Sequence, residues 1–233
     1  MWKKISRLVV DGRIKKMRTA RRKMLKEVDN LHVRLQRGNE KTGINCWTVS
    51  LLPAIDCCKN CKECMWDCYD IKNVLWQPAV VNDRARNSAI HFKDIRRFWS
   101  EVNMQIKANF VTELRINVGG DLSDEDFAYV AKIGCMNPQT KILFFTKNYE
   151  GINKFLDNNT FTNNVHPIMS AWLNTEMSNP HNLPCSHVLY PTGETTAPKY
   201  GSVYCGGNCS ECAFEGKGCW TLGSGEHVIF EAH

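Results

Sequence analysis

The order of apolar segments along the chain limits its fold more than any other feature of the sequence. Runs typical of buried strands occur at 45–55, 113–121, 141–148, 166–173 and 186–190. Two segments whose apolar residues recur at helical spacing, 84–109 and 123–134, separate the first three of these runs. Strands that alternate with helices are typical of a parallel sheet with helices packed on it. We therefore predict an α/β fold.

Three polar or cysteine-rich motifs each follow directly after an expected strand. They are the cysteine-rich stretch 56–70, the sequence GGD at 119–121 and the sequence TKN at 146–148. Parallel α/β sheets bind ligands outside the carboxyl ends of their strands. We therefore expect the three motifs to lie together at one edge of the sheet and to form the functional site.

The number of cysteines favours metal binding. The chain has 12 cysteines, and its N-terminus lacks an apolar run with a small-residue cleavage site. Without such a signal the expected location is cytoplasmic, which means the host cytosol if the chain is phage-encoded. Structural disulfides are uncommon in that reducing compartment, so metal ligation is the better interpretation. No apolar stretch is long enough to span a membrane, and no membrane partner is expected.

The first cysteine group is DCCKNCKECMWDCYD, residues 56–70. Two sets of three ligands fit its spacing: Cys57, Cys61 and Cys64 as C-x3-C-x2-C, or Cys57, Cys64 and Cys68 as C-x6-C-x3-C. Thiolates suit zinc and iron–sulfur clusters because sulfur is a soft ligand. Three ligands from a short loop leave the fourth iron of a cubane open to a small molecule, whereas structural zinc prefers four ligands.

A second cysteine group, CGGNCSECAFEGKGCW, lies near the C-terminus. Its spacing, C-x3-C-x2-C-x6-C, offers four thiolates in a glycine-rich segment, from Cys205, Cys209, Cys212 and Cys219. Such a set predicts a metal site but leaves zinc and a fully ligated iron–sulfur cluster open. It can also lend a cysteine to the first group.

The remaining candidate residues carry weaker signals. Cys46, Cys135 and Cys185 stand alone and are interpreted as buried core thiols. His181 and His187 form no metal signature and are interpreted as surface or structural residues. No Ser-His-Asp set, P-loop or HExxH motif occurs, and the sequence names no catalytic residue.

The basic charge of the chain is concentrated in its first 44 residues. This part carries fourteen Lys and Arg against four Asp and Glu, whereas the whole chain has a net charge of +6. Apolar residues from Ile14 to Leu31 recur at helical spacing, with RTARRK on the other side, and RGNEKTG at 37–43 ends the segment. Two interpretations remain open: contact with nucleic acid or another polyanion, and a solvated face of a helix packed on the core.

The three motifs of the expected sheet edge together resemble the radical SAM superfamily. CCKNCKEC, NVGGDL and FFTKN occur in the order and spacing typical of that superfamily. The resemblance implies a [4Fe–4S] cluster on Cys57, Cys61 and Cys64. It also implies that Gly119, Gly120 and Asp121 bind the amino group of S-adenosylmethionine (SAM). A complete eight-stranded barrel takes about 250 residues, so the roughly 160 residues of the core predict a partial, open barrel of about six strands.

A narrower resemblance is to the phage-associated gene product 88 proteins. It is carried by TVSLLPAIDC, CYD, RARNS, LRINVGGDL, ILFFTKN and the closing C..C......CW, which together cover residues 45–220. In that pattern the first group is C-x6-C-x3-C-Y, which corresponds to Cys57, Cys64 and Cys68. The resemblance implies a phage, prophage or mobile-element origin but supplies no reaction.

We therefore expect a basic helical arm at 1–43, an α/β partial-barrel core at 44–200 and a cysteine-rich metal-binding segment at 201–233. The expected function is that of an iron–sulfur protein resembling a radical SAM enzyme, with one [4Fe–4S] cluster or two, SAM, and an unknown substrate. Zinc is the alternative metal at the C-terminal site. The alternative function is a non-catalytic, metal-bearing factor that binds nucleic acid or a host protein.

Overall fold

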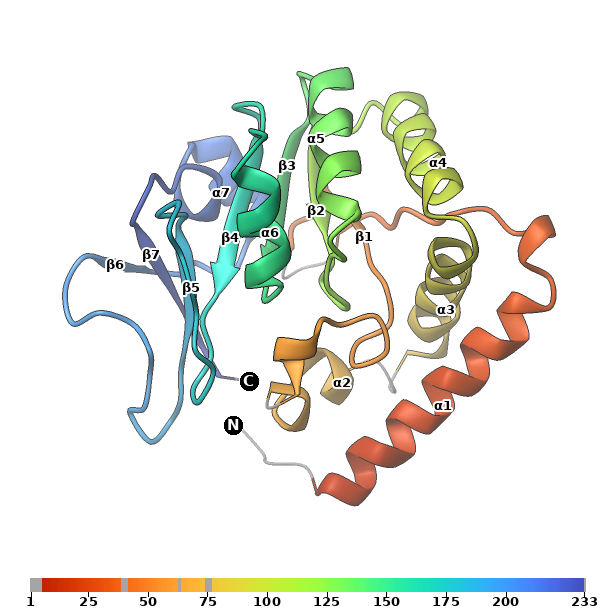
Figure 1. Cartoon of the computed structure of the whole chain (residues 1–233), viewed down its shortest axis with the longest axis horizontal. Coiled ribbons are helices and arrows are strands. Elements are labelled where there is room, and N and C mark those ends of the chain that lie inside the picture. Colours follow the sequence, from red (N-terminus) through yellow and green to blue (C-terminus); the bar gives the residue numbers. More distant parts are fainter. Residues whose placement is uncertain (1–5, 39–41, 63, 74–76, 233) are drawn as a thin grey trace.

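The centre of the molecule is an open sheet of seven parallel strands (Figure 1). The computed structural model describes residues 6–38, 42–62, 64–73 and 77–232. The strand order is β1-β2-β3-β4-β5-β7-β6, and every neighbouring pair is parallel. The strands are β1 (Cys46–Val49), β2 (Glu113–Ile116), β3 (Lys141–Thr146), β4 (Val165–Ser170), β5 (Cys185–Leu189), β6 (Ser202–Tyr204) and β7 (His227–Glu231).

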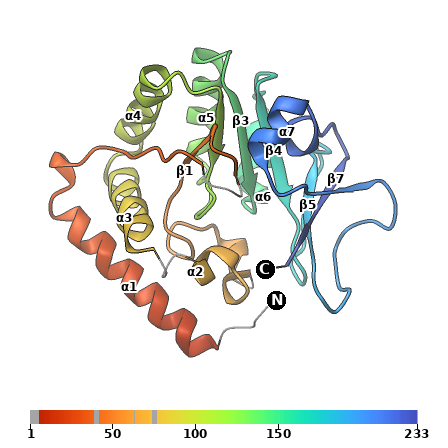
Figure 2. The same ribbon diagram turned by 180° about the vertical axis from the view of Figure 1, so that it is seen from behind.

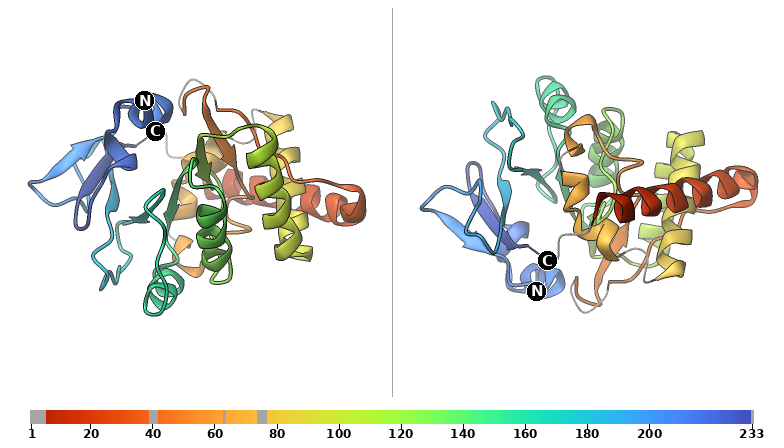
Figure 3. Two further views of the ribbon diagram at one scale, coloured as in Figure 1. Left: turned by 90° about the horizontal axis from the view of Figure 1, so that it is seen from above. Right: turned by 90° about the horizontal axis from the view of Figure 1, so that it is seen from below.

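Helices cover both faces of this sheet. Figures 2 and 3 show α5 and α6 on one face and α7 on the other, with α1 lying across the outside of α3. The α-helices are α1 (Arg7–Leu25), α2 (Tyr69–Asn73), α3 (Pro78–Lys93), α4 (Ile95–Ala108), α5 (Asp126–Met136), α6 (Tyr149–Leu156) and α7 (Cys209–Glu215). Short 3-10 helices lie at Val28–Asn30, Lys59–Cys61, Cys64–Trp66 and Gly218–Trp220.

Alternation along β3 shows how each face is filled. Ile142 and Phe144 belong to the main core, where Phe144 lies 6.1 Å from Phe127 of α5, measured between ring centroids. Leu143 points the other way and packs with Ala213 of α7 in a separate buried cluster. Successive side chains of a strand point to opposite faces, so the C-terminal cysteine segment covers the face that the outer helices leave free.

The sequence predicted the α/β class and five of the seven strands. The segment 84–109 forms two helices instead of one, because Asp94 is extended, with φ −155° and ψ 93°. Its carboxylate accepts a hydrogen bond from the backbone N of Arg97 at 2.9 Å and so begins α4. The structure also adds β6 and β7, which join the edge of the sheet beyond β5.

The basic arm is a helix, but a shorter one than the apolar pattern predicts. α1 ends at Leu25, Val28 lies in a 3-10 turn, and Leu31 is extended. Residues 39–41 of the expected end lie outside the described residues. Val10 and Ile14 are buried where α1 packs on neighbouring elements. Among the described residues, no helix is both long and apolar enough to cross a membrane.

A buried carboxylate links three helices on the outer face. Asp126 lies at the start of α5 and accepts hydrogen bonds from Ser123 N at 2.7 Å and Ser123 Oγ at 2.8 Å. It also bonds Trp99 Nε1 at 2.6 Å and His91 Nε2 at 2.7 Å. Burial lowers the pKa of His91, but the hydrogen bond to Asp126 and the nearby acidic charges together outweigh burial and raise it. Burial raises the pKa of Asp126, but the hydrogen bond to His91, the charge of His91 and the bonds from Ser123 and Trp99 together outweigh burial and lower it.

These opposite shifts predict a pH-dependent loss of stability in His91→Gln. The charge of His91 stabilises the fold below its unfolded pKa of about 6.5, and this contribution is lost as pH rises through its raised folded pKa. The charge of Asp126 contributes above about pH 3.8 and is lost as pH falls through its lowered folded pKa. Urea unfolding should show His91→Gln destabilised by about 1 kcal/mol more at pH 5.5 than at pH 9. Equal losses at both pH values would mean that His91 is neutral in the folded protein.

Candidate functional site

The three motifs that were expected at one edge meet beyond the carboxyl ends of β1, β2 and β3. Asp121, from the turn after β2, links them. Its Oδ1 accepts hydrogen bonds from Thr146 Oγ1 at 2.7 Å and from Leu122 N at 2.7 Å. Its Oδ2 accepts from Lys147 N at 2.9 Å and lies 3.3 Å from the sulfur of Cys58. Burial raises the pKa of Asp121, although these hydrogen bonds oppose the shift.

The glycines before Asp121 allow close packing under the cysteine loop. Asp70 and Arg84 form a buried ion pair next to Gly119. A β-carbon at Gly119 would overlap the carboxylate of Asp70 and crowd the guanidinium of Arg84. Gly120 has φ +86°, a left-handed conformation that favours glycine, and it packs against Leu51. Gly119 of GGD, Asp70 of CYD and Arg84 of RARNS are therefore in mutual contact.

Three sulfurs gather around that of Cys61 in the first cysteine group. The Cys61 thiol lies 3.7 Å from that of Cys58 and 3.9 Å from Asp121 Oδ2. Its contacts with Cys57, Cys58 and Cys64 raise its pKa. The hydrogen bond from Cys61 and the nearby charge of Lys147 lower the pKa of Cys64 to about 7. The sulfurs of Cys58 and Cys61 and a carboxylate oxygen of Asp121 lie within 4.8 Å of one another, close enough to share a metal.

Cys68 lies beside this group and not within it. Its side chain packs against a small hydrophobic cluster that includes Met17 of α1 and Ile71 of α2. Burial, more than any neighbouring charge, raises the pKa of this thiol. The structure therefore brings Cys57, Cys61 and Cys64 together more closely than it brings any of them to Cys68.

Lys147 is a half-buried cation beside the first cysteine group. Its Nζ donates to Ser170 Oγ at 3.1 Å and lies 5.0 Å from the ring centre of Trp172. Burial lowers the pKa of Lys147, but the nearby charges of Cys64, Cys61 and Asp121 together outweigh that effect and raise it. The lysine thus stays protonated and supplies positive charge where thiolates would bind a metal.

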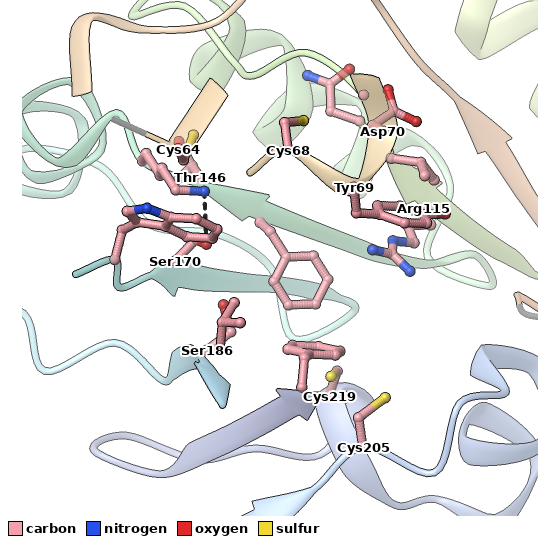
Figure 4. A pocket seen from close by; sticks show the side chains of 18 of the residues that line it. Cys64, Cys68, Tyr69, Asp70, Arg115, Thr146, Ser170, Ser186, Cys205 and Cys219 are labelled. Atoms are coloured by element: carbon pink, nitrogen blue, oxygen red, sulfur yellow. Dashed lines mark hydrogen bonds between the residues drawn. The ribbon is translucent and has the colours of Figure 1, made fainter. Parts of the chain in front are cut away.

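Both cysteine groups open into one cavity of about 420 Å³ on the face of the sheet that carries α7. Figure 4 shows Cys64 and Cys68 on one side of this cavity and Cys205 and Cys219 on the other, with Arg115 between them. Most of its surface is apolar, and six aromatic residues line it: Tyr69, Phe145, Trp172, Tyr190, Trp220 and Phe230.

In the C-terminal cysteine group, Cys205 directly follows β6 and Cys209 lies beside the amino end of β1. Cys209 is hydrogen-bonded to Cys46, the first residue of β1, and lies 3.6 Å from Arg115 Nη1. The bond to Cys46 and the charge of Arg115 lower the pKa of Cys209 to about 6, although burial opposes the shift. Burial raises the pKa values of Cys212 and Cys219, and the nearby charges of Cys205 and Cys209 add to both shifts. Cys205 and Cys219 lie across the cavity from Cys64 and Cys68.

Sequence reasoning missed two residues at the C-terminal group. Cys46 is fully buried, as predicted for a core thiol, but it contacts Cys209. Arg115 lies between the buried residues Leu114 and Ile116 in β2. Because successive side chains of a strand alternate between faces, the sequence could have placed Arg115 on the face opposite the main core. The contact of Cys46 left no signal, because it depends on how distant segments of the chain pack.

The structure also tests the predictions for two single cysteines and two histidines. Cys185 is buried, as expected, but Cys135 is exposed at the end of α5, so the prediction of a core thiol there is wrong. His187 is a buried structural residue whose Nε2 lies 2.9 Å from His227 Nδ1 and whose Nδ1 lies 2.8 Å from Thr196 Oγ1. His181 is half-buried and pairs with Asp157 at 3.1 Å.

Comparison with known proteins identifies the family. The model of the family described as Gene product 88 matches residues 14–219. This chain belongs to the gene product 88 family. No curated protein and no solved structure matches it. The family predicted from the motifs is thus confirmed.

Proposed function

We propose that this gene product 88 protein is an iron–sulfur enzyme of radical SAM type that acts on a small substrate in the central cavity. One observation carries the proposal. The first cysteine group and the glycine–acid turn 119–121 line the same cavity at the carboxyl ends of β1 and β2. An open parallel sheet places ligands at that edge, and the partial barrel of radical SAM type is part of the proposal.

The residues at this edge fit an iron–sulfur cluster by their chemistry. Soft thiols surround Cys61, and Lys147 provides a balancing positive charge. The hard carboxylate of Asp121 is already occupied by hydrogen bonds from three different residues. A soft sulfur site with its carboxylate engaged favours zinc or iron–sulfur over magnesium or calcium.

Three thiolates are assigned to the cluster: Cys57, Cys61 and Cys64. Cys61 contacts three other sulfurs, whereas Cys68 packs against apolar residues beside the group. This difference supports Cys57, Cys61 and Cys64 over the alternative set of Cys57, Cys64 and Cys68. When a [4Fe–4S] cluster and SAM are bound, they supply one-electron reductive cleavage of the sulfonium C–S bond. Three protein ligands would leave one iron of the cluster without a protein ligand, and SAM would bind at that open position.

The glycine–acid turn is assigned to the amino group of SAM, with different roles for its members. Asp121 holds the two neighbouring loops in place, because its oxygens already accept hydrogen bonds from them. Gly120 lines the cavity, and no donor to its carbonyl is found among the described residues. The backbone carbonyl of Gly120 is therefore the acceptor we assign to the ammonium group, which glycine allows to approach closely.

The rest of the cavity is suited to hold a substrate away from water. Trp172 and Tyr190 pack edge to face with ring centroids 6.2 Å apart, on the side of Lys147. Phe145 and Arg115 stack at 5.0 Å toward the C-terminal cysteine group. We assign that group, Cys205, Cys209, Cys212 and Cys219, to a second cluster or to zinc.

Metal and sulfide analysis of anaerobically purified and reconstituted protein tests the proposal. We expect about four irons and four sulfides per chain if zinc fills the C-terminal site, and about eight of each if that site holds a second cubane. A preparation that takes up zinc alone at both sites would overturn the proposal.

A further inference from the structure

The inner face of α1 uses its arginines to hold the first cysteine loop. Arg21 Nη1 pairs with Asp56 Oδ1 at 2.9 Å, directly before the first cysteine. Arg13 Nη1 donates to the carbonyls of Ile71 and Lys72, at 2.8 Å each. These contacts explain one part of the basic charge of the helix, and they orient the opposite face toward solvent.

The outer face of α1 carries positive charges that the fold does not use. Six side chains there are exposed and form no ion pair with any described residue: Lys15, Lys16, Arg18, Arg22, Lys23 and Lys26. The stretch from Lys15 to Lys26 contains no acid, and the exposed Asp11 and Glu27 flank it. A fold needs no such concentration of like charge, because like charges on one helix repel one another.

Four of these cations form a regular row. Lys15, Arg18, Arg22 and Lys26 are three or four residues apart, and Lys26 continues the helical conformation with φ −70° and ψ −23°. Residues at this spacing lie on one side of a helix, and the row spans about 16 Å with steps of about 4.5 to 6 Å. We propose that this row binds the phosphate backbone of duplex DNA, an inference that does not rest on the proposed enzyme function.

The chemistry of the surface favours a duplex over other polyanions. No aromatic residue occurs between Lys15 and Lys26, and the exposed Phe92 beside α1 already stacks on Arg21 at 5.1 Å, so the row itself lacks the stacking contacts typical of single-strand binding. An amphipathic membrane helix needs a continuous exposed apolar face, whereas Ile14 and Met17 are buried and the exposed large apolar residues of α1 are Leu8 and Val9, both in its first turn. B-form DNA has a major groove wide enough to admit a helix along its phosphate edges, and A-form RNA does not.

Fluorescence anisotropy of the full chain with a labelled DNA duplex of about 20 base pairs tests the inference. The variant Lys15→Glu, Arg18→Glu, Arg22→Glu is compared with the control Lys107→Glu, Lys132→Glu, Lys154→Glu, which changes the net charge equally at exposed positions of α4, α5 and α6. We expect the α1 variant to bind about 100-fold more weakly at 50 mM salt. Its plot of log affinity against log salt should be less steep by about three, while the control resembles the wild type.

A neutral variant, Lys15→Gln, Arg18→Gln, Arg22→Gln, keeps the test valid if charge reversal prevents folding. It should show the same loss of slope with a smaller loss of affinity. The inference is overturned if either α1 variant binds as the wild type does, or if the control loses binding equally. Binding to anionic vesicles or duplex RNA without binding to DNA would also overturn it.

Discussion

Replacing Arg84 with methionine is expected to lower the free energy of unfolding by about 3–5 kcal/mol. Arg84 and Asp70 are both buried and pair with each other beneath the cysteine loop. Removing the guanidinium would leave the Asp70 carboxylate buried without its counter-charge, and that penalty exceeds the value of the pair itself. Because the pair packs on Gly119, the turn before Asp121 should loosen as well. Urea unfolding of the metal-free protein measures the change.

The double variant Arg84→Met, Asp70→Leu is the matched control. Leucine has nearly the shape of aspartate, so the pair would be replaced by apolar groups of similar volume. We expect the double variant to recover most of the lost stability, since apolar replacement of a buried pair is often neutral. If Arg84→Met alone were harmless, or if the double variant were less stable than the single one, the pair would not hold the three motifs together.

Replacing Cys61 with serine should remove the metal of the first cysteine group. The Cys61 sulfur contacts those of Cys57, Cys58 and Cys64. Its loss would remove the ligand that lies between the other proposed ligands. A serine hydroxyl is a hard ligand of high pKa and does not replace a thiolate at iron. If both groups carry clusters, we expect bound iron and sulfide to fall by about half after anaerobic reconstitution. The remainder would belong to the C-terminal group.

Cys68→Ser provides the comparison, because Cys68 packs against apolar residues beside the group. The proposed ligand set predicts that Cys68→Ser keeps its iron, with the same visible absorption as the wild type. If Cys68→Ser lost its iron and Cys61→Ser kept it, the ligands would be Cys57, Cys64 and Cys68 instead. Circular dichroism of both metal-free variants separates loss of ligation from loss of folding.

The sequence predicted the parallel sheet because its strands have strong local signals. β3, with Leu143 and Phe144 among its buried residues, is an apolar run bounded by polar residues. β6 was missed because it has three residues, two of them exposed, and therefore no apolar pattern. β7 was missed although it is as long as the predicted β5, so its apolar run at 228–230 was a usable signal. The break at Asp94 was missed because apolar spacing continues across it.

The sequence predicted those parts of the candidate site whose residues directly follow a strand. Asp121 and Lys147 come together because parallel strands end at the same edge. The contact of Cys46 with Cys209 was not predictable in this way, because it joins the first strand to a segment near the C-terminus. The role of Asn87 in RARNS was also hidden: its Nδ2 donates to Ser50 O at 3.2 Å and so fixes α3 to the chain after β1. Long-range packing of this kind leaves no local pattern in the sequence.

The central claim is that the first cysteine group holds an iron–sulfur cluster with an open position for SAM. Electron paramagnetic resonance of the dithionite-reduced, reconstituted protein, recorded before and after SAM is added, tests it most directly. We predict a reduced [4Fe–4S] signal that shifts with SAM in the wild type and in Cys68→Ser, and no shifting signal in Cys61→Ser. An iron–sulfur signal that is indifferent to SAM, or protein that contains zinc alone, would contradict the claim.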